Sequence, residues 1–502
     1  MSPQGHEIQG RGIHLSGAAG VPGFAERLRA ALPPEAEILE RPGPAGAGKP
    51  GAILLRLADA AALPAGAPST GTLPAGTPST GRVWRIVDEA GTPLASPRFG
   101  RRQCCRAPGL LSVFLVERDA PSASWRCLGE AHLGAWRPHG ALARAAAEAA
   151  ATLVAAAIRQ PAPGRPWLAA RRQGPDWPGR WRIAHALRRA RDKLTSENWA
   201  IGIAAIAPAA LQRSQVVTGA CWVMPPDSRG YHADPFPWPG RPGVVLCEYF
   251  DHTTGLGRLR ALRLGGMPGQ ARQEEVPLQA RGHLSYPFAW VEDGRVLCMP
   301  EMAASRRQEI FELAPDGPPR PVATVAEDVG MADPTLFRHG GLYWVAYTDT
   351  ALGLHDNLCL MFAEDIKGPW RRHPGNPVKI DVRSSRPAGP LLGAGGRLLR
   401  PAQDCAASYG AALVINEILE CTPRAYREKV VAVLSPDPEG PFPHGLHTIA
   451  PMADGRFLLD GKRVSVSPGI LLRRLLRRLP ALGASWRGAL RPLHKPATGW
   501  RG

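Results

Sequence analysis

The chain has 502 residues, which is too long for one ordinary domain, and its 44% hydrophobic and 21% charged residues exclude an intrinsically disordered protein. Proline (53) and glycine (56) together exceed a fifth of the chain, which argues against long helical bundles. The net charge of +18 arises from an arginine-rich composition typical of G+C-rich coding sequences, so it is weak evidence for nucleic-acid binding.

The cysteine pattern points to a reducing compartment. Nine cysteines with no CxxC pair form neither a disulfide framework nor a zinc ribbon. Charges occur throughout residues 1–30, and we find no apolar segment of the length that a signal peptide needs. We therefore expect a cytoplasmic protein, without a cofactor.

Residues 1–160 are predicted to form a smaller α/β domain. Short strands are expected over 12–15, 52–57 and 83–87, and helices over 24–32 and 141–158. The second helix contains Arg144 and Glu148, which favours a soluble helix over a membrane span. Residues 63–82 duplicate a ten-residue Pro, Gly, Ser and Thr segment, which predicts a disordered insert. Residues 161–196 are predicted to be a linker and a helix.

Residues 197–465 repeat one pattern five times. A small-residue or proline turn is followed by a short strand, a glycine hairpin and a second strand, with starts at 233, 284, 332, 388 and 447. The resulting spacings of 51, 48, 56 and 59 residues suit one four-stranded blade each, which predicts an all-β five-bladed β-propeller. The alternative is a β-sandwich with chance repetition.

Residues 466–502 are predicted to be a basic C-terminal tail. Leucines and arginines alternate over 470–479 so that they occupy opposite faces of a helix. Such a helix is suited to weak contact with an anionic membrane surface. The alternative is a terminal helix that packs on the protein with its arginines in water.

Three acids are predicted to converge at the propeller axis, because first strands of blades are innermost. Asp234 and Asp333 lie at the starts of blades one and three, and Glu301 ends the second strand of the blade between them. An inverting glycosidase needs one carboxylic acid and one carboxylate about 6.5–9.5 Å apart, and a third acid can tune the pKa. These three are therefore our candidate catalytic residues. The alternative is that Asp before Pro only caps a turn.

A second group of residues is predicted to contact the substrate. Arginine forks bind carboxylate or phosphate, amides and carboxylates bind sugar hydroxyls, and histidines at blade starts can donate to a sugar oxygen. The candidates are His283, Arg383, Arg386, Arg400, Gln403, Asp404, Tyr409 and His447. A lone histidine is also common as a turn cap, and the acids are too scattered to predict a metal site.

Six segments, among them "HADPFPW", "MADPTLFRHGGLYWVAYTD" and "NPVKIDVRSSRPAGPLL", carry a resemblance. They resemble the N-terminal domain of the glucosamine inositolphosphorylceramide transferase family, which is similar to the five-bladed propellers of glycoside hydrolase family 43. The resemblance implies that Asp234 is the general base and that Asp333 and Glu301 are the tuning acid and general acid. In those hydrolases the tuning Asp precedes the acid Glu, whereas here Glu301 precedes Asp333.

The resemblance also bears on the rest of the chain. It implies an N-terminal domain similar to a formyltransferase, here degenerate, because no Asn-His-Asp arrangement at that spacing is present. The plant family's separate transferase domain has no counterpart in the 37 or so residues after the propeller.

Two functions are therefore open. One is an enzyme that acts on a glycoside, polysaccharide or glycolipid, by inverting hydrolysis with Asp234 as base. The other is a non-catalytic carbohydrate-binding propeller that serves glycan biosynthesis. A nucleic-acid-binding protein is disfavoured, since no recognition helix or basic-aromatic run is present.

Overall fold

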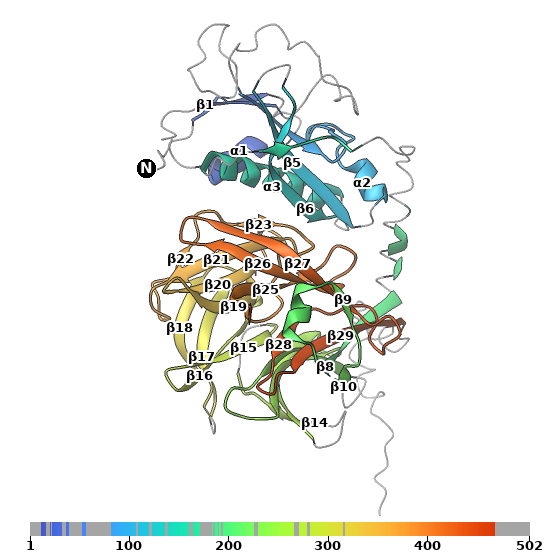
Figure 1. Cartoon of the computed structure of the whole chain (residues 1–502), viewed down its shortest axis with the longest axis vertical. Helices are drawn as coiled ribbons and strands as arrows, with labels where there is room; N and C mark the ends of the chain where they lie inside the picture. Colours follow the sequence, from blue (N-terminus) through green and yellow to red (C-terminus); the bar gives the residue numbers. More distant parts are fainter. Residues whose placement is uncertain are drawn as a thin grey trace, which may run out of the picture.

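A computed structural model describes most of residues 82–170 and 194–466, together with residues 12–16, 23–32, 37–39, 53–56 and a few positions between 183 and 191. It contains an α/β domain and a five-bladed propeller, as the sequence predicts (Figure 1). Residues 63–81 of the duplicated insert and the segment 470–479 lie outside the described residues, and so does most of the helix expected in 161–196.

The α/β domain is built on one seven-stranded sheet of order β2-β1-β3-β4-β5-β6-β7, parallel from β2 to β4 and antiparallel from β4 to β7. The strands are β1 (Gly12–Ser16), β2 (Glu37–Leu39), β3 (Ile53–Arg56), β4 (Arg82–Asp88), β5 (Leu110–Arg118), β6 (Arg126–Gly134) and β7 (Arg165–Pro166). The helices are α1 (Phe24–Ala31), α2 (Arg101–Arg106) and α3 (His139–Arg159). The expected strands and helices of residues 12–159 are thus confirmed.

Helix α3 supplies much of the core of this domain. By length and composition alone, Gly140–Arg159 is apolar enough to cross a membrane, but 61% of its apolar window is buried inside the protein. Its residues Leu142, Ala146, Ala150 and Val154 join the core that α1 and β5 also line. The small alanine side chains let the helix lie close to the sheet, as in a core helix of a globular domain.

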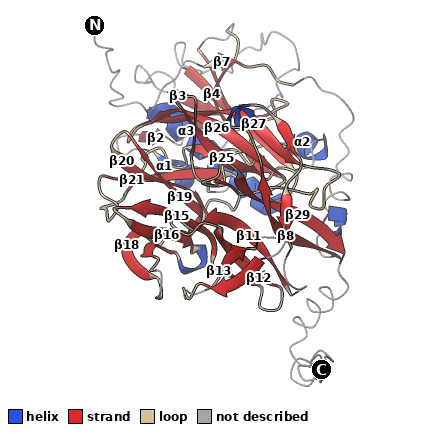
Figure 2. Cartoon of the chain, turned by 60° about the horizontal axis from the view of Figure 1, so that its bottom comes forward, coloured by secondary structure: helices blue, strands red, loops and turns tan. Residues whose placement is uncertain are grey.

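Five sheets form the propeller, and the last one is closed by strands from both ends of the domain (Figure 2). Blade one contains β11 (Gly230–Pro237), β12 (Val244–Asp251), β13 (Leu256–Leu264) and β14 (Ala271–Glu275). Blade two contains β15 (Ser285–Glu292), β16 (Arg295–Glu301), β17 (Arg307–Glu312) and β18 (Arg320–Glu327). Blade three contains β19 (Met331–His339), β20 (Leu342–Asp349), β21 (Asn357–Ala363), β22 (Arg371–Arg372) and β23 (Lys379–Ile380).

Blade four contains β24 (Leu392–Ala394), β25 (Arg397–Asp404), β26 (Ala412–Cys421) and β27 (Tyr426–Pro436), extended by β9 (Gln215–Val217). Blade five combines β28 (Ile449–Pro451) and β29 (Phe457–Val466) with β8 (Thr195–Ala204) and β10 (Cys221–Val223). The antiparallel pairing of β29 with β8 runs from Thr195 to Ala204 and closes the ring. Short 3-10 turns over Pro208–Gln212 and Ala303–Ser305 complete the assignment.

The first strands of blades one, two and three share an irregularity that places side chains at the axis. A β-bulge interrupts the pairing at the residue before proline, and this residue has a positive φ of 52° at Asp234, 47° at Tyr286 and 49° at Asp333. Such a conformation is uncommon for residues other than glycine. In blade four the equivalent turn uses Gly389, with a φ of 134°.

The α/β domain contacts the propeller at blades three and four. The Val382 amide donates to the His132 carbonyl (2.8 Å), and Arg159 Nη1 donates to the Pro374 carbonyl (2.6 Å). Ile380 packs against the core of the α/β domain. The two domains therefore share an interface that combines a main-chain hydrogen bond, a side-chain hydrogen bond and apolar contact.

Candidate functional site

Hydrogen bonds between the five blade starts form a ring around the axis. The Tyr286 amide donates to Asp234 Oδ2 (3.2 Å), and the Tyr286 hydroxyl lies 2.8 Å from Thr335 Oγ1. The Ile449 amide donates to the Ala388 carbonyl (2.8 Å). Together with Arg386 of blade four, which binds Asp333 of blade three, these contacts bring all five blade starts together, as predicted.

Asp234 lies at the junction of blades one and five. Its Oδ1 accepts a hydrogen bond from Thr448 Oγ1 (2.7 Å) and lies 3.0 Å from His447 Nε2. His447 Nδ1 lies 2.9 Å from Asp460 Oδ2, and Asp460 also accepts hydrogen bonds from the amides of Asp234, His447 and Thr448 (3.0 Å each). The imidazole is thus held between two buried carboxylates.

His447 is a cation at neutral pH. Burial by itself lowers the pKa of a histidine, but the charges of Asp460 and Asp234 outweigh it and raise the pKa of His447 to about 10. One ligand atom from each of Asp234, His447 and Asp460 lies within 4.8 Å of the others, which is the only metal-compatible cluster in the described part of the chain. The imidazolium offsets one of the two carboxylate charges and lies within hydrogen-bond distance of both side chains.

Asp333 lies at the junction of blades three and four. Its Oδ2 accepts hydrogen bonds from Arg386 Nε and Gln403 Nε2, both at 2.6 Å, and its Oδ1 accepts from Arg386 Nη2 at 3.3 Å. Arg386 also lies over the ring of Tyr409, 5.0 Å from its centroid. Four predicted residues thus meet here: the catalytic candidate Asp333 and the binding candidates Arg386, Gln403 and Tyr409.

Glu301 differs from both aspartates. Its Oε2 accepts the Asp333 amide at 3.0 Å and lies 3.7 Å from Arg386 Nη2. Burial and the charge of Asp333 raise the pKa of Glu301 to about 8, despite the opposing effect of Arg386. Glu301 is therefore protonated at neutral pH.

A second buried glutamate, Glu248, was missed by the sequence analysis. Burial and the charge of Asp234 raise its pKa well above the ordinary value. His283, another predicted residue, lies beside it: Nδ1 accepts the Gly257 amide (2.9 Å), so the neutral ring carries its proton on Nε2, which lies 3.2 Å from Glu248 Oε1. Burial lowers the pKa of His283, consistent with a neutral ring.

Strand pairing places Glu248 and Glu301 at equivalent positions of blades one and two. Glu248 pairs with Ala233 and Glu301 pairs with Ser285, each one residue before the bulge, and Thr348 pairs with Ala332 in the same way in blade three. In blade four the Gln403 amide donates to the Arg386 carbonyl, three residues before Gly389, and in blade five Asp460 accepts the Thr448 amide. Aligning the second strands of blades one to three in the sequence would have identified the position of Glu248.

Aromatic rings border the cluster on the side of blade five. The ring centroid of Trp199, a buried residue of β8, lies 4.0 Å from that of His447. The ring centroid of Tyr409 lies 5.2 Å from those of both His447 and His355. Tyr409 is only partly buried, unlike Trp199. Tyr409 and His355 are therefore the less buried aromatic residues of this group.

Three predicted binding residues lie outside the axial cluster. Arg400 is buried within blade four, where Glu428 accepts two of its hydrogen bonds (2.7 and 2.8 Å). Arg383 binds the carboxylate of Asp381 with two hydrogen bonds of 2.9 Å, near the domain interface. The Asp404 side chain caps its own turn by accepting the Ala406 amide (2.8 Å). The structure gives these residues protein partners in place of a position at the axis.

Comparison with known proteins agrees with the expected resemblance. Glucosamine inositolphosphorylceramide transferase 1 from Oryza sativa subsp. indica is 28% identical over 158 residues, which cover 30% of this chain and 21% of the rice protein. The Arabidopsis thaliana protein of the same name is 26% identical over 223 residues, or 42% of this chain and 29% of that protein. This chain therefore spans less than a third of the length of these relatives.

Two solved structures are similar at lower identity. A GH43 β-xylosidase/α-arabinofuranosidase from a compost microbial metagenome is 17% identical, with 48% of this chain and 93% of that chain covered and a TM-score of 0.32. The GH43_1 enzyme from Xanthomonas citri is 14% identical, with 48% and 88% covered and a TM-score of 0.31. The family model described as glucosamine inositolphosphorylceramide transferase 1, N-terminal, matches residues 270–439, so the resemblance predicted from the motifs is confirmed for this part of the propeller.

Proposed function

We propose that the propeller acts on a glycosidic bond at the axial cluster, with Asp234 as the general base and Glu301 as the general acid. The observation that carries this proposal is the contrast between the two acids. Asp234 faces the His447 imidazolium, whereas burial and Asp333 keep Glu301 protonated at neutral pH. Environments that separate two carboxyl groups in this way assign an acid and a base.

The proposed reaction is hydrolysis with inversion. Asp234 takes a proton from water as the water oxygen bonds to the anomeric carbon, and Glu301 gives its proton to the departing glycosidic oxygen as that bond breaks. Asp333, fixed by Arg386 and Gln403, raises the pKa of Glu301 and so fills the role of the tuning acid. Tyr409 supplies an aromatic face for a sugar ring.

The names of the plant relatives support a saccharide or glycolipid as the class of ligand. A second function, recognition without turnover, is favoured by one specific observation. Protein donors already occupy both carboxylate oxygens of Asp234, and both oxygens of Asp333 face Arg386. In that case the same cluster holds the blades together beside a lectin-like binding surface.

A glycan array with the purified chain, followed by product analysis on every glycan that binds, tests the proposal. Asp234→Asn preserves the shape of the side chain and removes the base, so we expect it to abolish turnover while binding persists. Asp454→Asn, an exposed acid paired with Arg456 on the β28–β29 hairpin, is the matched control. Thermal melts of both variants verify folding. Binding without product from the unmodified chain would favour recognition, and no binding at all would refute both functions.

A further inference from the structure

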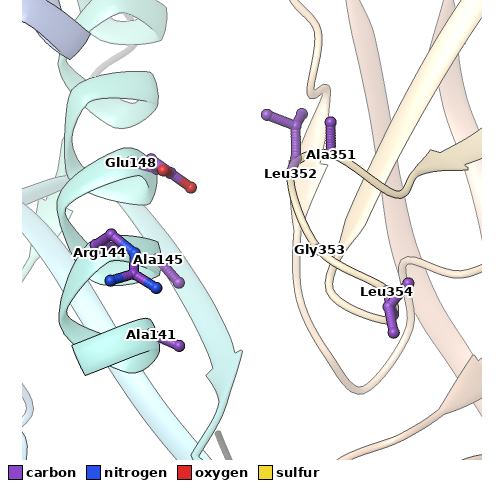
Figure 3. A pocket seen from close by; sticks show the side chains of 8 residues that line it. All are labelled: Ala141, Arg144, Ala145, Glu148, Ala351, Leu352, Gly353 and Leu354. Atoms are coloured by element: carbon purple, nitrogen blue, oxygen red, sulfur yellow. The ribbon is translucent and has the colours of Figure 1, made fainter. Parts of the chain in front are cut away.

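An open pocket of about 340 Å³ lies between the α/β domain and the propeller. One wall is the first half of α3, with Ala141, Arg144, Ala145 and Glu148, and the other is the loop that joins β20 to β21, residues 351–354. Figure 3 shows the helix and the loop facing each other, with the Glu148 and Ala145 side chains directed toward the loop. The pocket thus joins residues from two domains.

The charges at this pocket favour an anion. Arg144 is exposed and has no ion-pair partner among the residues that the structure describes. Glu148 is countered by Arg27 of α1, whose Nε lies 3.6 Å from Glu148 Oε1. Arg27, which lies outside the lining, therefore offsets the charge of Glu148 and leaves Arg144 as the cation of the lining. Leu352 and Leu354, both exposed, give the opposite wall an apolar surface.

The same loop also contacts the axial cluster. Arg386, which binds Asp333, donates from Nη1 to the Leu354 carbonyl (2.9 Å) and lies 3.2 Å from His355 Nδ1. β20 ends at the axial end of blade three, because Thr348 pairs with Ala332, the neighbour of Asp333. Leu354 therefore lines the pocket while its own carbonyl is bound by a residue of the axial cluster.

A second loop at this end of the propeller also reaches the α/β domain. A Cβ atom on Gly109, which has a φ of 109°, would lie 2.0 Å from the Ala406 carbonyl oxygen in the loop between β25 and β26. Arg188 donates to the Ala407 carbonyl in the same loop (2.7 Å). The α/β domain thus lies beside the end of the propeller that carries the axial cluster.

We propose that the pocket is a second subsite, which binds an anionic group, phosphate or carboxylate, carried by the saccharide that occupies the axial cluster. Arg144 pairs with the anion, and Leu352 and Leu354 contact the apolar face of the adjoining sugar ring. This inference rests on the proposed function and extends it, since it makes the α/β domain part of the binding site and selects anionic glycans over neutral ones.

The test compares matched neutral, phosphorylated and uronic-acid glycans on the full chain by array and by titration calorimetry. We expect Arg144→Glu to weaken the affinity for anionic glycans about tenfold and to leave the affinity for neutral glycans unchanged. The substitution removes one charge-assisted contact at an exposed site and replaces the positive charge there by a negative one. Leu352→Trp, which fills the pocket, should weaken the binding of both classes of glycan, and that of anionic glycans more strongly. Arg98→Glu makes the same change of charge outside the pocket and should leave both classes unchanged.

Each outcome decides one question. The phosphorylated and uronic-acid arms identify which anion the pocket prefers, and the Arg144 contribution should fall as salt is raised. If neutral glycans bind as tightly as anionic ones, or if Arg144→Glu leaves the preference intact, the subsite is refuted while the axial function stands. If no glycan binds, the proposed function fails and the subsite fails with it.

Discussion

The charge of His447 makes the stability of the propeller depend on pH in a predictable direction. Its pKa is about 10 in the folded protein and 6.5 ordinarily, so the folded state retains a proton that the unfolded state loses. The resulting stabilisation is fully present below pH 6.5 and is lost as pH rises through 10. Between pH 6.5 and 8.5 the loss is about 2 kcal/mol, because the slope reaches about 1.4 kcal/mol per pH unit only once the unfolded-state histidine, half protonated at pH 6.5, has lost its proton.

Equilibrium urea unfolding at pH 6.5, 7.5 and 8.5 measures this loss. Glu248 and Glu301 also have raised pKa values and add a slope of the same sign, so the measurement is made in the Glu248→Gln, Glu301→Gln double variant. Keeping the pH at or below 8.5 avoids buried thiols, whose ordinary pKa is 9.0.

A second readout identifies the residue responsible. NMR of histidine labelled in the ring should show His447 still protonated at pH 8.5, and a His447→Gln spectrum assigns the signal. His444, three residues away and exposed, is the matched control, and its replacement should leave the pH slope unchanged. Stability that is flat or rises over this range, or a ring that loses its proton near pH 6.5, would refute the ion-pair assignment.

Three further predictions concern other parts of the propeller. Gly389→Ala should destabilise the protein by about 3 kcal/mol or more in chemical denaturation, because the new Cβ atom would lie 1.9 Å from the Ile449 carbonyl oxygen. In the control variant Gly393→Ala the new Cβ atom meets open space, so the loss of stability should be under about 1 kcal/mol. If the propeller is catalytic, Glu301→Gln should abolish turnover and retain binding, and the activity of the unmodified chain should fall above about pH 8 as the acid loses its proton. Burial raises the pKa of Glu428, but the charges of Arg400 and Lys379 outweigh it and lower the pKa to about 2. Replacing Glu428 by Gln should therefore lower the free energy of unfolding at pH 7 by about 3–5 kcal/mol, as measured by urea unfolding.

The propeller architecture was predictable because the sequence repeats one local pattern. Turn, strand and hairpin recur five times, and each copy carries its own glycine or proline, so the blades and the position of Asp234 and Asp333 at the axis follow from local patterns. The closure of the ring by β8 was not predictable in detail, because this strand lies before the first repeat and has no hairpin partner next to it in sequence.

The composition of the site was only partly predictable for a related reason. Residue type alone does not distinguish an arginine at the axis from one inside a blade. Arg386 and Arg400 lie fourteen positions apart in the same arginine-rich region, yet one binds Asp333 across blades and the other is neutralised by Glu428 within its own blade. Which carboxylate an arginine meets is decided by strand register, and register is set by tertiary packing.

The closure of blade five has a consequence for the order in which the protein is made. Asp460 holds His447 and the Asp234 amide, but it lies on β29, the last strand of the propeller, while its partner strand β8 precedes the first blade. On the ribosome, Asp234 emerges more than two hundred residues before Asp460. The first four blades are therefore synthesised with an open seam and an incomplete axial centre. Only when the final strand leaves the exit tunnel can it pair with β8, so closure of the ring and assembly of the axial cluster occur in one late, long-range step.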